Sequence, residues 1–348
     1  MAVRLPAEWE PQSAVMLTWP HANTDWGTDL PVVLGVMAAI AKAICSEQTL
    51  LSVCVSDTHC EQVRALLKAA GADASRLRFA VAPSNDTWAR DHGPLTTLGA
   101  LGPVINDFAF NGWGGKFDAK NDNEITARLC SKKVFGSNTV KTSSFVLEGG
   151  AVETDGQGTL LATRSSLIDQ RRNPDMDCAE IEAVLTESLG IHRYLWLDHG
   201  ALSGDDTDSH IDTLARFVDR HTIAYATVPE GHPDSISLQA MAEQLQRFRT
   251  VTGEPYRLVP LPFPGWHTDD EGRLLPASYA NFLIINHRVL LPIYGVDNDQ
   301  LAIACLRELT PDRRIVPIDC RPIIRQNGSL HCLTMQFPAA LTVYDASP

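Results

Sequence analysis

The stretch from Gly204 to Arg216 gathers residue types that could perform proton transfer on a small cation. It reads Gly-Asp-Asp-Thr-Asp-Ser-His-Ile-Asp-Thr-Leu-Ala-Arg and continues into an apolar run. If the stretch is extended, alternate side chains share one face. The residues on that face are Asp206, Asp208, His210 and Asp212. A histidine close to carboxylates can move a proton while the carboxylates hold a cation. A solvated acidic loop with an incidental histidine is the alternative.

Two further polar clusters lie at the edges of apolar runs. In residues 85–94, Trp88 and Asp91 precede a Gly-Pro turn, which suits a site loop on a rigid scaffold. An ordinary surface turn is the alternative there. In residues 145–150, Glu148 ends an apolar run and two glycines follow, so we expect a buried carboxylate and a close backbone approach. A hairpin turn is the alternative at this position.

A fourth cluster, residues 326–334, reads Gln-Asn-Gly-Ser-Leu-His-Cys-Leu-Thr. Cys332 follows a polar loop that contains a glycine and precedes apolar Leu333. Such a cysteine can be a nucleophile if nearby cations stabilise its thiolate. A buried, inert cysteine is the commoner alternative.

The elements that must position these clusters alternate between strands and helices. Five amphipathic or capped helices recur at intervals of roughly 60 residues, which favours an internally repeated architecture. The expected helices are 59–70, 123–133, 178–189, 235–249 and 298–309. Pairs of short apolar runs with turn residues lie between them and predict strand pairs. An ordinary two-domain α/β enzyme is the alternative.

Composition narrows the partners and the compartment. The 348 residues include 42 acidic and 29 basic side chains, for a net charge of −13. We therefore expect no nucleic acid and no membrane as partners, and attraction of a small cation. The apolar segment 32–44 is interrupted by Gly35 and Lys42, so we expect a core helix too short to span a bilayer. The start of the chain lacks a signal-peptide pattern and the eight cysteines are scattered, which predicts a cytoplasmic protein.

In their order along the chain, these clusters resemble the agmatine deiminase and bacterial-type peptidylarginine deiminase family of the guanidine-modifying (pentein) superfamily. The resemblance covers nearly the whole chain. The matching motifs are Pro-Ala-Glu-Trp-Glu-Pro at 6–11, Trp-Ala-Arg-Asp-His-Gly-Pro at 88–94, Asn-Gly-Trp-Gly-Gly-Lys at 111–116, Leu-Glu-Gly-Gly at 147–150, Asp-Thr-Asp-Ser-His-Ile-Asp at 206–212, and His-Cys at 331–332.

The resemblance implies a fold and a reaction. The fold is a fivefold pseudosymmetric α/β propeller of strand–helix–strand repeats, forming one catalytic domain over residues 1–348. The reaction is hydrolysis of agmatine to N-carbamoylputrescine and ammonia, a step of putrescine biosynthesis, through a covalent amidino-cysteine. The resemblance implies no metal and no organic cofactor, and it is compatible with a homodimer.

The resemblance also implies roles for five residues. Cys332 resembles the nucleophile, His210 the general acid and base, and Glu148 the carboxylate that orients this histidine. Asp91 and Asp212 resemble the pair that grips the guanidinium. These roles suit the chemistry, because a planar guanidinium presents N–H donors that match carboxylates two at a time.

Substrate choice depends on three further residues. We expect Asp206 to meet the terminal ammonium of agmatine, and Trp88 and Trp113 to enclose its four-carbon chain. Packing of Trp113 against the core is the alternative.

Three other functions compete with agmatine deimination. An arginine or peptidyl-arginine deiminase would use the same chemistry. A manganese ureohydrolase would use the Asp-x-His-x-Asp pattern of residues 208–212 as metal ligands. A non-catalytic binding protein of the same fold is the third alternative, although such proteins lack the catalytic residues.

Overall fold

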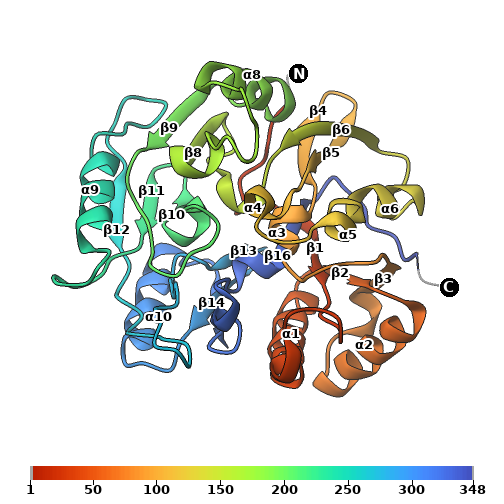
Figure 1. The fold of residues 1–348 in the computed structure, drawn as a ribbon. Helices are drawn as coiled ribbons and strands as arrows, with labels where there is room; N and C mark the ends of the chain where they lie inside the picture. Colours follow the sequence, from red (N-terminus) through yellow and green to blue (C-terminus); the bar gives the residue numbers. More distant parts are fainter. Residues whose placement is uncertain (1–2, 347–348) are drawn as a thin grey trace.

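The computed structural model describes residues 3–346, and the strands in this range form five small sheets (Figure 1). One sheet has the order β16-β1-β2-β3, and the others have the orders β4-β5-β6, β7-β8-β9, β10-β11-β12 and β13-β14-β15. The strands are β1 Gln12–Thr18, β2 Thr49–Cys54, β3 Leu77–Val81, β4 Leu95–Gly99, β5 Gly102–Ala109, β6 Thr139–Val146, β7 Glu153–Thr154, β8 Thr159–Thr163, β9 Arg193–Leu197, β10 Ala215–Asp219, β11 Thr222–Tyr225, β12 Arg257–Pro260, β13 Leu283–Ile285, β14 Arg288–Ile293, β15 Arg314–Asp319 and β16 Thr334–Pro338.

The five sheets repeat one pairing scheme. In each three-stranded sheet the first two strands are antiparallel and the last two are parallel. The four-stranded sheet follows the same scheme because β16, from the far end of the chain, pairs antiparallel with β1, and β1 pairs parallel with β2. A parallel connection needs a long crossover, and at least one helix lies in each of these crossovers. The expectation of an α/β chain built from repeated units is confirmed at this level.

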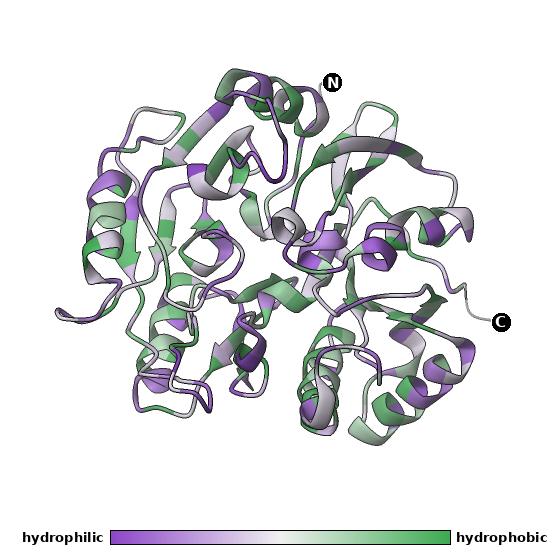
Figure 2. Ribbon diagram, in the orientation of Figure 1, coloured by the Kyte–Doolittle hydropathy of each residue, from purple (hydrophilic) through white to green (hydrophobic). Residues whose placement is uncertain are grey.

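The longer helices lie on the outside of the molecule (Figure 1). The helices are α1 Leu30–Cys45, α2 Asp57–Ala70, α3 Ala89–His92, α4 Gly112–Gly115, α5 Lys120–Asn123, α6 Ile125–Ser131, α7 Arg164–Leu167, α8 Cys178–Leu189, α9 Ser235–Leu245 and α10 Asn298–Leu309. Figure 2 shows hydrophilic and hydrophobic residues interleaved along the outer helices, as expected for helices that bury one face.

Two of the predicted helices have the observed bounds, and local capping explains the bounds of one of them. The predicted helices 178–189 and 298–309 are confirmed as α8 and α10. A capping box between Asp177 and Glu180 begins α8, and left-handed Gly190 ends it. The predicted helix 123–133 instead divides at Glu124 into α5 and α6.

Helix α1 and the 3-10 turn η1 (Gly27–Asp29) before it form a long apolar segment. The segment Gly27–Cys45 has 19 residues and a mean hydropathy of 1.7, which is sufficient to cross a membrane by length and composition. The expectation that this region is too short to span is therefore wrong. However, half of the segment is buried inside the molecule, and α1 contacts α2, β2 and β15. It is a core helix, as expected.

Four short helical segments, called here the lead-in segments, each lie directly before the first strand of a sheet. They are α3 before β4, η3 (Gly149–Ala151) before β7, η4 (Ile211–Thr213) before β10 and η6 (His331–Leu333) before β16. The segment α3 contacts both η3 and η6, and η3 contacts η4. Each carries or adjoins one of the four clusters singled out in the sequence, so the fold brings these distant clusters to one place.

Candidate active site

A cavity of about 210 Å³ opens next to the lead-in segments. Its wall contains Cys332 and Asp91 together with Trp88, Trp113 and Asp206. The three residues predicted to contact the substrate therefore lie in the same cavity as the predicted nucleophile. Trp113 also packs edge-on against Phe110 and Phe117, so the packing alternative describes part of its surroundings.

Carboxylates dominate the charged groups of the cavity wall. The charged residues that line it are Asp25, Asp86, Asp91, Asp206 and Arg325. Arg325 is already paired with Asp29 and Asp270, each at 2.9 Å. Burial raises the pKa of Asp86 to about 6, although the Thr87 N–H and the Trp88 indole donate to its carboxylate. Such a cavity stabilises a bound cation far better than an anion.

Cys332 lies in η6 and is 7% exposed. Its Sγ accepts a hydrogen bond from Asn281 Nδ2 at 3.4 Å and lies 3.8 Å from Asp212 Oδ2. Burial, together with the carboxylates of Asp212 and Asp91, raises the pKa of the Cys332 thiol well above its ordinary value. The resting group is therefore a neutral thiol, and only a cation brought close to it would favour the thiolate.

Asp212, next to this sulfur, has one carboxylate oxygen in use and one free. His331 Nδ1 lies 2.7 Å from Asp212 Oδ2, and His331 Nε2 lies 2.7 Å from Glu8 Oε2. Asp212 Oδ1 is buried and has no hydrogen-bond partner within the described part of the chain. Although burial opposes ionisation, the hydrogen bond with His331 lowers the pKa of Asp212. A buried, ionised oxygen without a donor is a vacant acceptor for a ligand N–H.

Asp91 stands on α3 and faces the same region. Its Oδ2 accepts from the Trp113 indole at 2.9 Å, and its Oδ1 accepts from the Gly150 N–H at 2.9 Å. The Oδ1 atom also lies 3.6 Å from His210 Nδ1. Burial raises the pKa of Asp91 to about 6.

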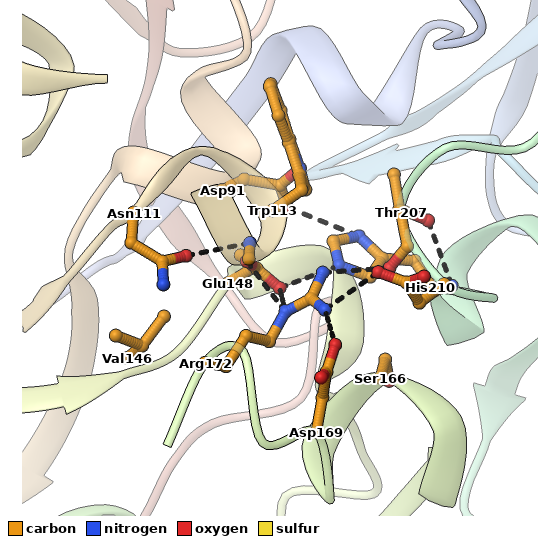
Figure 3. Close-up of polar contacts among 12 residues, drawn as sticks. Asp91, Asn111, Trp113, Val146, Glu148, Ser166, Asp169, Arg172, Thr207 and His210 are labelled. Atoms are coloured by element: carbon orange, nitrogen blue, oxygen red, sulfur yellow. Dashed lines mark hydrogen bonds and ion pairs between the residues drawn. The ribbon is translucent and has the colours of Figure 1, made fainter. Parts of the chain in front are cut away.

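His210 and Glu148 form a buried pair, each side chain 1% exposed, with His210 Nε2 donating to Glu148 Oε2 at 3.1 Å (Figure 3). Burial alone would lower the pKa of His210, but the carboxylates of Asp91 and Glu148 raise it to about 9. At neutral pH this imidazole is a protonated, oriented acid. The structure thus brings together all five residues for which the sequence predicted catalytic roles.

The two glycines of η3 are required by close approach, as expected from the sequence. A Cβ on Gly149 would lie 2.2 Å from the Arg90 carbonyl oxygen. A Cβ on Gly150 would lie 2.5 Å from His210 Nδ1 and 2.8 Å from Asp91 Oδ1. Real side-chain atoms do not approach so closely, so only glycine fits at these two positions. The flanking strands β6 and β7 belong to different sheets, so the hairpin-turn alternative is wrong.

The expected extended conformation of residues 206–212 is also wrong. Asp208 and Ser209 have φ values of 65° and 71°, so the chain turns there and the four predicted side chains do not share a face. Asp206 lines the cavity, whereas the Asp208 carboxylate binds Lys116 at 2.7 Å and Arg172 at 2.8 Å. Short polar side chains tolerate the left-handed region and are stabilised by local hydrogen bonds, which alternation patterns do not encode.

This turn bears on the manganese alternative. The Asp208 carboxylate is engaged by Lys116, Arg171 and Arg172, so it cannot join His210 as a metal ligand without breaking ion pairs. Within residues 3–346, no group of three or more His, Cys, Asp or Glu side chains is arranged to hold a metal ion.

Strained backbone concentrates at the cavity. Six non-glycine residues in the described range have positive φ, and four of them lie on or beside the cavity wall. These four are Trp113, Asp208, Ser209 and Asn327. Left-handed conformations cost about 1–3 kcal/mol each and persist where the surroundings enforce them, often at functional sites.

Several site residues were not predicted. Asp25 and Asp86 line the cavity, Asn281 donates to Cys332, and Glu8 contacts His331. Asp86 lay inside a cluster that the sequence did single out, and Glu8 lay inside the matched N-terminal motif. Only the folded chain shows that these side chains face inward.

Comparisons with known proteins identify the family of the chain. The family model described as Porphyromonas-type peptidyl-arginine deiminase matches residues 4–338 of the chain. The chain therefore belongs to this family, which confirms the resemblance to agmatine deiminases and bacterial peptidylarginine deiminases.

Individual relatives cover nearly the whole chain. An agmatine deiminase from Stutzerimonas stutzeri is 33% identical over 96% of this chain and 95% of its own. A Porphyromonas gingivalis structure, provisionally described as an arginine deiminase, is 47% identical with a TM-score of 0.92, covering 98% of this chain and 99% of its own. A substrate-bound C. jejuni agmatine deiminase variant is 33% identical with a TM-score of 0.89, covering 97% of both chains. These relatives carry two different substrate descriptions.

A more distant likeness concerns the fold alone. A structure described as DDAH from Pseudomonas aeruginosa has a TM-score of 0.50 at 13% identity, covering 94% of this chain. The fold is thus pentein-like: a mixed α/β chain with five small sheets.

The close packing at Gly150 gives a direct test of the site. Gly150→Ala forces a methyl group between His210 and Asp91, so we expect about a 100-fold loss of activity on a guanidine, measured as ammonia release. The control is Gly35→Ala on α1, where nothing lies within 4 Å of the added Cβ and activity should be unchanged. A wild-type rate for Gly150→Ala would show that this geometry is not needed.

Proposed function

We propose that this protein is an agmatine deiminase, which hydrolyses agmatine to N-carbamoylputrescine and ammonia. The observation that supports this most strongly is the neutral thiol of Cys332 beside two carboxylates, one with a vacant buried oxygen. A planar cation with several N–H donors satisfies those carboxylates and also favours the thiolate. A guanidinium has both properties.

In the proposed first half-reaction, Asp91 and Asp212 hold the guanidinium with its central carbon facing Cys332. As the cation binds, the thiol releases its proton to solvent and the thiolate attacks the carbon. The resulting tetrahedral adduct is neutral. Protonated His210 gives its proton to one amino group, the C–N bond breaks, and ammonia leaves an amidino-cysteine.

In the second half-reaction, the neutral imidazole of His210 takes a proton from water as the water oxygen adds to the amidino carbon. The new adduct breaks its C–S bond, releases the carbamoyl product, and the sulfur regains a proton. Glu148 keeps the imidazole oriented and stabilises its charged form in both halves, since it accepts from Nε2 and leaves Nδ1 facing Asp91.

Further carboxylates on the cavity wall support an amine on the substrate. Asp206 lines the wall and its Oδ2 accepts from Asn327 Nδ2 at 2.9 Å. Asp25 and Asp86 add carboxylates to the same cavity, and Trp88 and Trp113 offer aromatic surface for a methylene chain. The relatives described as agmatine deiminases agree with this substrate.

A second candidate is an arginine or peptidyl-arginine deiminase with the same chemistry. Arg325 on the cavity wall could meet a carboxylate, and the 47% identical Porphyromonas gingivalis protein carries that provisional description. Ammonia release from agmatine, free arginine and a peptidyl-arginine separates the two candidates. Agmatine should have the highest kcat/KM, and a higher value for either arginine substrate would overturn the choice of agmatine.

A further part of the proposal concerns the domain organisation and the closure of the five repeated units. We infer one catalytic domain in which the five repeated units close into a pseudo-fivefold propeller. The support is that β16 completes the pairing of the N-terminal unit, and that lead-in segments from different sheets contact one another.

The acid role of His210 predicts a pH dependence. Since its pKa is raised to about 9, kcat should fall as pH rises through that region and the proton needed by the leaving ammonia is lost. Glu148→Gln removes a charge that raises this pKa, so kcat should drop and its basic limb should move down by about one pH unit. Rates of ammonia release from pH 6 to 10 measure both effects. The control is Glu187→Gln, because Glu187 is exposed and its substitution should leave the profile unchanged. A wild-type pH profile for Glu148→Gln would show that Glu148 has only a structural role.

The amine contact predicts a change in KM. Asp206→Asn should raise KM for agmatine about tenfold, as expected for loss of one charged contact, while KM for butylguanidine, which lacks the amine, stays unchanged. Asp86→Asn is the matched variant on the same cavity. Equal effects of Asp206→Asn on both substrates would show that Asp206 does not bind the amine, and a selective effect of Asp86→Asn would assign that contact to Asp86.

A further inference from the structure

Arg172, in the loop after α7, is the most completely engaged cation near the site, and its side chain is 1% exposed. Its Nε donates to both oxygens of Glu148, at 2.9 and 2.7 Å (Figure 3). Its Nη1 donates to Asp169 at 2.6 Å and to Asp208 at 2.8 Å, and its Nη2 donates to the Thr207 carbonyl at 3.0 Å.

The contact with Glu148 bears directly on His210. Glu148 Oε2 accepts from Arg172 Nε at 2.7 Å and from His210 Nε2 at 3.1 Å. Arg172 therefore fixes the plane of the carboxylate and shares with the imidazole the oxygen that orients it. A carboxylate buried to this extent is costly to keep charged unless a cation is paired with it.

The other contacts bear on the cavity wall. Asp206 and Thr207 line the cavity, and Asp208 immediately after them is held in a left-handed conformation. Arg172 binds the Thr207 carbonyl and the Asp208 carboxylate, so one guanidinium supports both the proton-transfer pair and the wall that faces the substrate.

We propose that Arg172 is a positioning residue for the reaction: it holds Glu148 in the orientation that presents His210 and sets the proton affinity of this pair. The inference rests on the proposed function for its kinetic consequences, and its geometry stands independently of which guanidine is the substrate.

The neighbouring Arg171 provides a matched comparison. Arg171 also binds Asp169, and it binds Asp208 at 2.8 Å, but its side chain is 49% exposed and it makes no contact with Glu148. If Arg172 acts only as a structural tie for the 205–209 turn, substitution of either arginine should have similar consequences. If it acts through Glu148, only Arg172 should affect His210.

The expected sign follows from the charges around the pair. The charged groups that act on His210 and Glu148 are Asp91 on α3, Asp212 on η4 and Arg172, with Asp169 and Asp208 behind Arg172. Arg172 is the cation among these neighbours that contacts the pair directly. Its removal leaves carboxylates in excess, so the pair should bind its proton more tightly.

The first test needs no substrate. The imidazole of His210 is titrated by NMR in wild-type protein, Arg172→Gln and Arg171→Gln, with its signal assigned by its absence in His210→Gln. In Arg172→Gln the titration should move up by about one pH unit or more, and in Arg171→Gln it should stay within about 0.3 unit. An unchanged titration in Arg172→Gln, or equal shifts in both variants, would overturn the proposal.

The second test uses the guanidine that the wild type hydrolyses fastest. Arg172→Gln should lower kcat about 100-fold, while Arg171→Gln should affect only KM. If Arg172→Gln does not fold, Arg172→Lys serves instead, since it keeps the charge but not the two-oxygen contact; it should lower kcat at least about tenfold with KM within about twofold. A wild-type kcat in Arg172→Lys would overturn the proposal. Absence of ammonia release by the wild type from every guanidine would refute the proposed function, and the NMR titration would still decide the role of Arg172.

Discussion

An excess of buried negative charge around a neutral thiol is the constraint on which this structure depends. Asp91, Asp212 and Glu148 are almost fully buried at this site. Glu148 pairs with His210 and Arg172, and the buried cations Arg90 and Arg216 act on Asp212. Buried carboxylates are tolerated when they are paired, and an unpaired one remains ready for a cationic ligand. The same charges that suppress ionisation of the thiol in the free protein would hold a guanidinium, which in turn would release the thiolate. The buried carboxylates of the site therefore favour the binding of a cation.

The fold makes this charge cluster possible because four of the five sheets begin at the cluster. Asp91, Glu148, His210 with Asp212, and Cys332 lie in or next to four different lead-in segments. Rigid strands directly behind each segment fix the side chains, and close backbone contacts at Gly149 and Gly150 leave little room for adjustment. The backbone strain at Trp113 and Asp208 is consistent with segments held in place by their neighbours.

Much of this arrangement could be predicted from the sequence, and the remainder could not for physical reasons. Helices such as α8 and α10 have clear periodicity, and α8 is also capped at both ends. The polar clusters stand out because they interrupt apolar runs. The conformation of the 205–209 turn depends on Asp205, whose carboxylate accepts from the Thr207 and Ser209 N–H groups, and on three cations from elsewhere in the chain. Arg171 and Arg172 are indistinguishable as neighbours in sequence, yet one is exposed and the other buried. Only tertiary contacts determine the conformation of this turn and which of the two arginines is buried.

The central claim, that Cys332 forms a covalent amidino intermediate, is tested most directly by mass spectrometry of protein quenched in acid during turnover of agmatine. Digestion should locate an amidino adduct on the peptide that contains Cys332, and the adduct should be absent from Cys332→Ser protein treated in the same way. An adduct on any of the other seven cysteines, or turnover by Cys332→Ser at the wild-type rate, would contradict the account.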